Sequence, residues 1–316
     1  MLWVSLSVRS MKKVCIAVAL IFLVILTSFA AFAEEGSGMQ HIPVQDDEMI
    51  VPSETGETGT DWFENRQLLL RKYLTEYGGI DDPAVLEKKV SSMSVDPDKP
   101  MIALTFDDGP VLGVTDRILD LLEKYNVRAT FFICGWRLKT EGAPELLKRM
   151  VALGCELANH TYNHTRVKNA DQAFVWKTIR VNNNVIRRIV PDYPILSFRP
   201  PSGGTSLSVR MAAKRNGMSV VLWSQSGNVH AEDAESIYAN VLKQEVDGRQ
   251  LQDGDIVLLH DTKERMVEAM ELLIPDLLRQ GYQLVTVQEL LHYGGQGMEP
   301  GVQYYSSKEF KYAGNE

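Results

Sequence analysis

The sequence predicts an α/β fold in which about seven parallel strands form a distorted, incomplete (β/α) barrel. From Lys99 onward, short apolar runs alternate with segments of helical periodicity, and this alternation is typical of a parallel sheet with right-handed crossovers. Acidic residues or histidines end several of these runs. A closed eight-stranded barrel usually needs about 250 residues, so the shorter stretch 99–293 indicates an incomplete one.

The expected strands are the short apolar runs, and the expected helices fill the intervals between them. Strands are predicted at 101–106, 129–133, 155–158, 195–199, 218–224, 255–260 and 282–286. Helical patterns occur between them, for example at 115–125, 143–153, 170–189 and 263–279. The stretch 99–293 is therefore expected to be one domain, and the Gly- and Tyr-rich stretch 294–316 a loose C-terminal tail.

Residues 34–98 are predicted to be an acidic linker that ends in a short helical segment. Residues 34–60 carry seven acids and no Lys or Arg, a composition that cannot bury a core. Residues 61–78 have the apolar spacing of an amphipathic helix, with Asp61 as its expected N-cap. We expect this helix to pack on the following domain, and residues 79–98 to be a connector.

Residues 1–33 have the features of an export signal. The purely apolar run Val14–Leu26 is 13 residues long, which is short for a membrane span of about 20 residues. The sequence Ala31-Phe32-Ala33 is a cleavage site of the A-x-A type. An uncleaved anchor is the alternative, because residues 27–33 could extend the run. Both forms predict a protein outside the cytoplasm, either secreted or anchored to the membrane.

The charge and the cysteines limit the possible partners and crosslinks. The formal net charge is −8, and loss of residues 1–33, with three basic residues and no acids, would make it −11. Nucleic acid is therefore not an expected partner, and a membrane is expected only through the N-terminal anchor. No long-range attraction to an anionic polymer is expected either. Cys134 and Cys155 should lie about 13 Å apart along the sheet, too far for a disulfide.

Two motifs carry the candidate chemistry. The first, 105–110, reads Thr-Phe-Asp-Asp-Gly-Pro, and the second, 160–164, reads His-Thr-Tyr-Asn-His. Alone, each has a plain explanation, as a turn signal or as two solvated histidines. Because both follow predicted strands of one parallel sheet, we expect them at one common edge. One Asp and two His could hold a metal ion while the second Asp acts as a base, a layout for metal-assisted hydrolysis.

With these motifs, the chain resembles the polysaccharide deacetylases of the NodB-homology type, carbohydrate esterase family 4. The stretches 105–110 and 160–164 resemble the first and second motifs of that family. Arg199-Pro200-Pro201-Ser202-Gly203 resembles the third motif, and Leu258-Leu259-His260-Asp261 the fifth. The resemblance runs from about residue 99 to residue 293, and it implies the same incomplete barrel.

The motifs and the resemblance together imply a metal centre with a base beside it. Asp108, His160 and His164 would bind one divalent metal ion, with Zn²⁺ the first expectation and Co²⁺, Ni²⁺ or Mn²⁺ also suited to these ligands. Asp107 would be the catalytic base, and Arg199 would hold it ionised. Without the family resemblance, Arg199 would equally fit a surface ion pair.

The remaining implied roles concern the substrate. His260 would be the general acid that protonates the leaving group. The backbone N–H of Ser202 would stabilise the oxyanion, although the family has a Tyr there, and Gly203-Gly204 is expected to loosen this loop. Leu258 would line the pocket for the acetyl methyl group, besides packing in the core.

The fourth family motif is altered in this chain. Family members usually carry an Asp-Trp pair after a strand that ends in Trp-Ser. Here Trp223-Ser224 is followed by Gln-Ser-Gly-Asn, and Val229 and His230 take the places of the Asp-Trp pair. The carboxylate that would tune the catalytic histidine is therefore missing.

The expected function is metal-dependent hydrolysis of the N-acetyl group of N-acetylglucosamine residues. The expected partner is an acetylated polysaccharide of the cell wall, peptidoglycan or a chitin-like glycan, with peptidoglycan preferred. One alternative is an O-acetyl esterase that acts on xylan or a similar polymer. Another is a non-catalytic, glycan-binding homologue, which the altered fourth motif suggests. A glycosidase is disfavoured, because its two carboxylates must stand about 5–9.5 Å apart across a bond.

Overall fold

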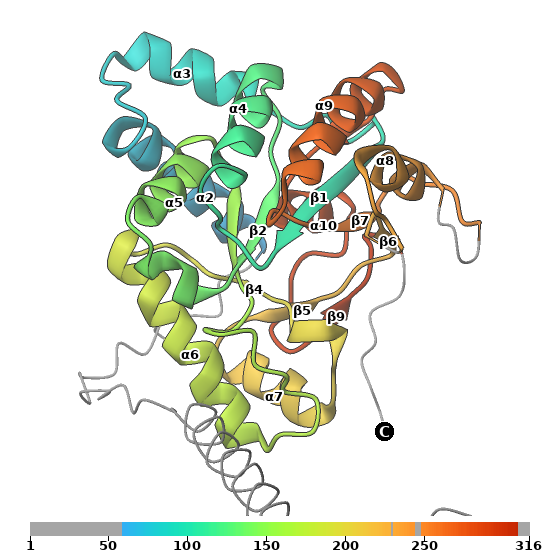
Figure 1. Cartoon of the computed structure of the whole chain (residues 1–316). Helices are drawn as coiled ribbons and strands as arrows, with labels where there is room; N and C mark the ends of the chain where they lie inside the picture. Colours follow the sequence, from blue (N-terminus) through green and yellow to red (C-terminus); the bar gives the residue numbers. More distant parts are fainter. Residues whose placement is uncertain (1–58, 229, 244–247, 309–316) are drawn as a thin grey trace, which may run out of the picture. The chain divides into compact units, whose positions relative to one another are not determined.

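The fold is built on one parallel sheet (Figure 1). The computed structural model describes residues 59–228, 230–243 and 248–308. The strand order is β6-β7-β1-β2-β3-β4-β5-β9, and β8 pairs with one end of β1. Every pairing between named strands in this part of the chain is parallel. The strands are β1 (Met101–Asp107), β2 (Thr130–Ile133), β3 (Glu156–Asn159), β4 (Ser197–Phe198), β5 (Ser219–Val221), β6 (Gln225–Ser226), β7 (Ile256–His260), β8 (Gln283–Leu284) and β9 (Gln303–Tyr304).

The predicted strands all occur, and the prediction of an incomplete parallel barrel is confirmed. All seven residues of β1 are buried, because helices and loops cover both faces of a parallel sheet. The observed strands at 197–198, 219–221 and 283–284 are shorter than predicted. β6 and β9 were not predicted, since two-residue strands depend on pairing partners rather than on an apolar run.

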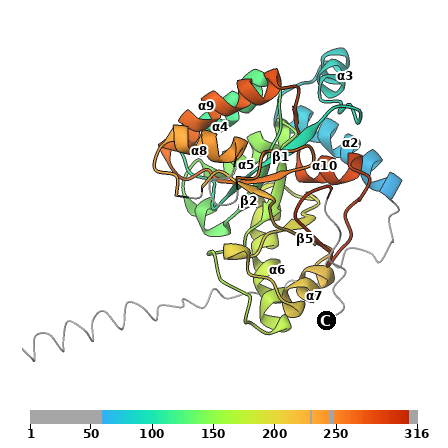
Figure 2. The same ribbon diagram turned by 90° about the vertical axis from the view of Figure 1, so that its right-hand side faces the viewer.

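Helices cover the sheet from outside (Figures 1 and 2). Helix α4, for example, turns Ile118, Leu119 and Leu122 into the core. The predicted helical segments are confirmed within one or two residues at each end. The helices of the barrel are α4 (Thr115–Tyr125), α5 (Ala143–Ala152), α6 (Gln172–Ile189), α7 (Leu207–Arg215), α8 (Ala234–Leu242), α9 (Glu264–Arg279) and α10 (Val287–Tyr293), with the 3-10 turns η1 (Gly135–Lys139) and η2 (Pro201–Gly203).

Within the described residues, two helices precede β1 and pack on the barrel. Helix α2 (Gly59–Glu76) buries Leu70, Tyr73 and Leu74, so the prediction that it packs on the following domain is confirmed. Asp61 is not its N-cap, because the helix already includes Gly59. The prediction of a plain connector at 79–98 is wrong, because helix α3 (Pro83–Ser92) forms there with a side-chain cap from Asp82.

A buried ion cluster holds α2 to the barrel. Glu289 of α10 accepts a hydrogen bond from Arg66 of α2 at 2.7 Å and contacts Arg128, which precedes β2, at 3.0 Å. Both cations help to lower the pKa of Glu289, against its burial, which acts in the opposite direction. The Glu289 side chain also accepts the backbone N–H of Thr286, which completes the capping box of α10.

The expectation of a loose tail after residue 293 needs correction. Residues 303–304 form β9, which pairs with β5, and Ser306 bridges to Asp255 just before β7. The C-terminal segment thus spans the opening between β5 and β7. Cys134 and Cys155 are free thiols, as expected. Among the described residues, none of the helices is both long and apolar enough for a membrane crossing. The predicted export signal at 1–33 lies outside these residues.

Candidate active site and metal centre

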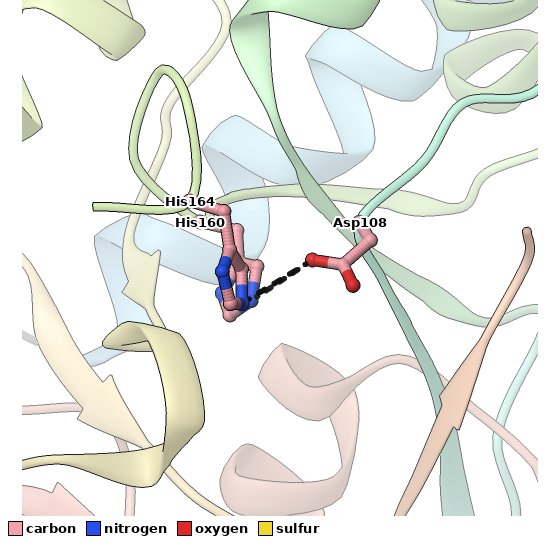
Figure 3. Close-up of side chains that lie close together, drawn as sticks. All are labelled: Asp108, His160 and His164. Carbon is pink, nitrogen blue, oxygen red and sulfur yellow. Dashed lines mark ion pairs between the residues drawn. The ribbon is translucent and has the colours of Figure 1, made fainter. Parts of the chain in front are cut away.

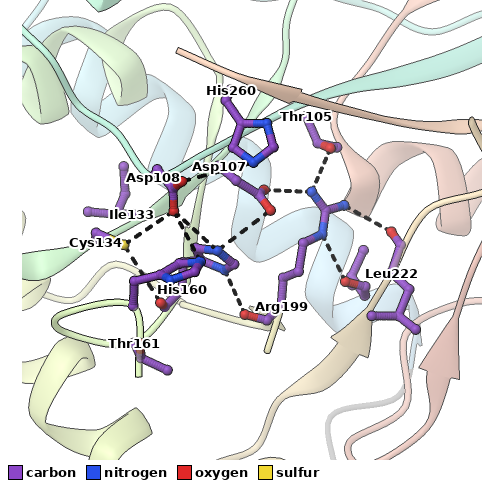
Figure 4. A network of polar contacts seen from close by, with 12 residues as sticks. Thr105, Asp107, Asp108, Ile133, Cys134, His160, Thr161, Arg199, Leu222 and His260 are labelled. Atoms are coloured by element: carbon purple, nitrogen blue, oxygen red, sulfur yellow. Dashed lines mark hydrogen bonds and ion pairs between the residues drawn. The ribbon is translucent and has the colours of Figure 1, made fainter. Parts of the chain in front are cut away.

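The polar residues of the two sequence motifs meet at the carboxyl ends of neighbouring strands (Figure 4). Asp107 is the last residue of β1, and His260 is the last residue of β7 and its direct partner in the register. His160 follows the last residue of β3. Because β7, β1, β2 and β3 are adjacent in that order, the fold brings these side chains to one edge of the sheet.

Asp108, His160 and His164 lie as a metal site requires (Figure 3). One ligand atom from each residue lies within 4.8 Å of the others. The Asp108 Oδ1 atom is 3.5 Å from Nε2 of His160 and 3.6 Å from Nε2 of His164. Ligand atoms at about 2.1 Å from one ion, at tetrahedral angles, would lie about 3.4 Å apart. The two distances from Asp108 are close to this value, so the three residues fit a single divalent ion.

The surroundings of His160 hold its imidazole ring in an orientation and a protonation state that suit metal binding. Its Nδ1 lies 2.8 Å from the carbonyl oxygen of Arg199, so Nδ1–H donates there and Nε2 turns its lone pair to the site. Burial lowers the pKa of His160, while Asp107 and Asp108 act in the opposite direction. A lowered pKa favours the neutral imidazole, the form that binds metal ions.

The loop with the two histidines is not a helix. It carries positive φ angles at Thr161 (64°) and His164 (56°), and Asp108 has a φ of 73°. Non-glycine residues in this left-handed region are uncommon and gather at functional sites. Side-chain hydrogen bonds hold the loop: Asn159 Oδ1 accepts the N–H of Thr161 at 2.8 Å, and the Thr161 hydroxyl accepts the N–H of Thr165 at 2.9 Å.

The two carboxylate oxygens of Asp107 have different surroundings. Its Oδ1 accepts a 2.6 Å hydrogen bond from Nη1 of Arg199. Its Oδ2 lies 3.7 Å from Nε2 of His160, and so faces the metal site. This carboxylate is therefore held beside the three candidate metal ligands and is not one of them, an arrangement that suits a base.

Arg199 is fully buried, so the alternative of a surface ion pair is wrong. Besides Asp107, its guanidinium donates to Thr105 Oγ1 at 2.8 Å and to the carbonyls of Val221 and Leu222 at 3.1 and 2.9 Å. It also stacks 3.9 Å from the ring centre of Phe132. Burial lowers the pKa of Arg199 and Asp107 opposes this effect, but a guanidinium stays protonated in proteins.

His260 faces the same site and is oriented by an amide. Its Nε2 lies 3.9 Å from Asp108 Oδ2, and its Nδ1 lies 3.1 Å from the Oδ1 of Asn228. Counting residues along the fourth family motif had pointed to Val229 and His230 instead. Val229 is outside the described residues, and His230 is exposed. Asn228 was therefore missed, although it stands in the altered fourth motif.

The two residues expected to bind the substrate differ in their exposure to solvent. Ser202 is exposed in η2 with a φ of 60°, and Leu258 is buried in β7, two residues before His260. The loop after Ser202 is not loose as expected. A Cβ atom on Gly203 would lie 2.7 Å from the ring of Trp223, and one on Gly204 would lie 2.9 Å from Lys168. Both glycines are thus tightly packed.

Asp261 is a buried carboxyl group behind the first motif. Its Oδ2 accepts a 2.5 Å hydrogen bond from Thr115 of α4, and burial raises its pKa to about 7. A Cβ atom on Gly109 would lie 2.2 Å from its oxygens, so only glycine fits at that position. The sequence contained Asp261 within the fifth motif but gave no sign that it underlies the Asp107–Asp108 turn.

Comparisons with known proteins agree with this geometry. A family model described as polysaccharide deacetylase matches residues 94–221. A peptidoglycan-N-acetylglucosamine deacetylase of Bacillus cereus is 39% identical over 199 residues, which are 61% of this chain and 89% of that protein. The solved structure of the peptidoglycan deacetylase PdaC from Bacillus subtilis has a TM-score of 0.57 and 35% identity, and the match covers 64% of this chain and 95% of that one.

A family 4 acetyl xylan esterase from Clostridium thermocellum, solved in complex with a cobalt ion, is similar as well. Its TM-score is 0.58 at 33% identity, and the match covers 66% of this chain and all of that one. The two solved structures share the parallel barrel of this chain and differ in the substrate that their descriptions give.

Proposed function

This chain belongs to the polysaccharide deacetylase family, and from that premise we propose that it hydrolyses the N-acetyl group of N-acetylglucosamine residues in peptidoglycan. One observation carries the proposal. Asp107 is fixed by Arg199 on one oxygen, and its other oxygen faces the cluster of Asp108, His160 and His164. The similarity to peptidoglycan deacetylases of Bacillus supports the choice of polymer.

Asp108, His160 and His164 would hold one divalent ion, with Zn²⁺ our first assignment and Co²⁺, Ni²⁺ or Mn²⁺ as alternatives. When bound, this ion would polarise the acetyl carbonyl and lower the pKa of a water molecule. Asp107 would take the proton of that water on Oδ2, while the hydrogen bond from Arg199 keeps the carboxylate oriented and ionised. Arg199 would therefore act on the reaction through Asp107, as a positioning residue.

His260 would return a proton to the leaving amine from Nε2, because Asn228 occupies its Nδ1. The backbone N–H of Ser202 would donate to the oxyanion, and it would do so whatever the side chain at this position. Leu258 would contact the acetyl methyl group from β7. The role of His260 is supported by its position beside Asp108, and the roles of Ser202 and Leu258 rest on the family motifs.

We also propose that the protein works outside the cytoplasm, where peptidoglycan lies. Residues 1–33 would direct export, and residues 34–58 would link the membrane or the cleaved end to α2. An exported protein that begins near Glu34 would support cleavage, and an intact Val14–Leu26 run in the exported protein would show that the segment is an anchor instead.

The proposed function is tested by acetate release from a panel of acetylated glycans. The purified chain is freed of metal, reloaded with Zn²⁺ or Co²⁺, and given N-acetylglucosamine oligomers, peptidoglycan and acetylated xylan. We expect release from the first two substrates with either metal and none from the metal-free protein. His160→Ala serves as the matched control, because it removes one metal ligand. Release from xylan alone would favour the O-acetyl esterase, to which the cobalt-bound relative is similar.

Replacing Asn228 should change the pH dependence of the proposed activity. His260 must be protonated to act as an acid, and an adjacent carboxylate stabilises the protonated imidazole by about 1 pKa unit or more. Asn228→Asp places such a carboxylate 3.1 Å from Nδ1 without a change of size. We expect the alkaline limb of the kcat/KM profile to move upward by about 1 pH unit.

Asn228→Ala is the control for that experiment. It removes the orienting contact without adding charge, so kcat should fall while the alkaline limb stays below that of Asn228→Asp. If the limb lies at the same pH in wild type and Asn228→Asp, His260 is not the group that limits activity at high pH.

A further inference from the structure

Helices α6 and α7 lie side by side (Figures 1 and 2). Both helices are rich in basic residues. Together they contain seven Lys or Arg residues and no Asp or Glu. The surrounding stretch 166–231 has ten basic and two acidic residues, whereas the whole chain has a net charge of −8. Acidic and basic residues are therefore distributed unevenly along the chain. The negative net charge of the whole chain does not reveal this basic segment.

Large apolar side chains are exposed on the same two helices. Phe174 of α6 is 42% exposed, and Leu207 and Met211 of α7 are 55% and 42% exposed. These are three of the eight large apolar residues exposed in the described part of the chain. Leu207 and Met211 are four residues apart, so they lie on one side of α7.

Two arginine side chains that stack on Trp176 connect the exposed side of α7 to α6. Arg215, four residues after Met211, lies 4.7 Å from the ring centre of Trp176 on α6. Arg180 lies 5.2 Å from the same ring centre. The apolar row of α7 thus runs into a cluster of two guanidinium groups and an indole ring. We call the surface made by Phe174, Lys177, Arg180, Leu207, Met211, Lys214 and Arg215 the α6–α7 face.

The cations of this face have no carboxylate partner among the described residues. No described Asp or Glu makes an ion pair with Lys177, Arg180, Lys214 or Arg215. The two acids of the stretch are engaged elsewhere. Asp171 caps the start of α6, and Asp192 pairs with Lys72 of α2. The charge of the face is therefore directed to the outside.

We propose that the α6–α7 face docks on the surface of an anionic lipid bilayer. Exposed Lys and Arg residues attract anionic headgroups, and apolar side chains on the same face insert between them. A soluble polyanion would match the cations but would leave Phe174, Leu207 and Met211 without a role. This contact goes beyond the proposed deacetylation and differs from our expectation that only the N-terminal segment meets a membrane.

Co-sedimentation with vesicles tests the proposal on the protein in its exported form. One set of vesicles contains phosphatidylcholine and phosphatidylglycerol in equal parts, and the other contains phosphatidylcholine alone. Any binding through a retained N-terminal segment is the same in all variants, so differences between variants report on the α6–α7 face. We expect wild-type protein to bind the anionic vesicles more tightly and to lose this difference at high salt, because salt screens the charges.

Two variants separate charge from apolar contact. Lys177→Gln with Lys214→Gln should weaken binding to anionic vesicles about 25-fold, since each cation near the surface contributes about fivefold. Lys88→Gln with Lys124→Gln, on α3 and α4, is the matched control and should bind as wild type does. Leu207→Ser with Met211→Ser should also weaken vesicle binding, while its binding to soluble polyphosphate should stay unchanged.

Three results would overturn the proposal. The first is equal binding of the wild type to both kinds of vesicle. The second is the same affinity for the α6–α7 lysine variant and its control. The third is an unchanged affinity of the Leu207 and Met211 variant for vesicles together with displacement of the wild type by polyphosphate, which would identify a soluble polyanion as the partner. Circular dichroism and acetate release from a soluble oligomer show that each variant is folded, independently of whether it docks.

Discussion

Asp107→Asn should reduce kcat by about 10²- to 10⁴-fold, the usual contribution of a general base, and should leave the metal content unchanged. The amide has the size of the carboxylate, and its oxygen can still accept the hydrogen bond from Arg199, which is 2.6 Å long in the wild type. It cannot take a proton from water. Acetate release and elemental analysis of the same preparation measure the two effects separately.

Asp108→Asn is the matched comparison, because the two residues are neighbours of the same type. Asp108 Oδ1 lies within 3.6 Å of both histidine Nε2 atoms, so this variant should lose metal as well as activity. An equal loss of metal from Asp107→Asn and Asp108→Asn would show that the two carboxylates have been assigned to the wrong roles.

Arg199→Met should lower the free energy of unfolding by about 3–5 kcal/mol, the usual effect of removing one partner from a buried ion pair. The guanidinium is fully buried and donates to Asp107, Thr105 and two carbonyl oxygens. In the metal-free protein, the carboxylate of Asp107 would then remain buried with no cation beside it. Denaturant unfolding at neutral pH measures the loss, and Arg166→Met, at an exposed site, should change stability by less than about 0.5 kcal/mol.

The double variant Arg199→Met with Asp107→Asn tests the cause of that loss. If the unpaired carboxylate is responsible, the double variant should be more stable than Arg199→Met alone, because a neutral amide costs less to bury than a charge. Equal stability of the two variants would place the loss in the carbonyl contacts of Arg199 instead.

The sequence predicted those parts of the protein that depend on local pattern. β1 and β7 are apolar runs, and the residues at their ends reach the site because carboxyl ends of parallel strands meet at one edge. Helix α3 had a local signal too, an Asp82 cap followed by Pro83. The prediction of a connector overlooked that signal in a segment with little apolar periodicity.

Other parts could not be predicted, because they depend on contacts between distant residues. Asn228 is separated from His260 by 32 positions, and only the pairing of β6 with β7 brings them together. β9 has two residues, and its strand character comes entirely from β5. The net charge of the whole chain gives no sign of the basic α6–α7 face, because acidic residues on other elements outweigh its positive charge.

The order of strands in the sheet also bears on when the site comes into being during synthesis. β1 lies at the centre of the sheet, yet one of its edges is hydrogen-bonded to β7 and β8, which are made much later. A growing chain that has not reached residue 254 lacks the backbone partners of that edge, and it also lacks His260. Such non-local pairings make folding slow and leave edges exposed. The nascent protein thus carries Asp108, His160 and His164 long before it has a finished barrel around them.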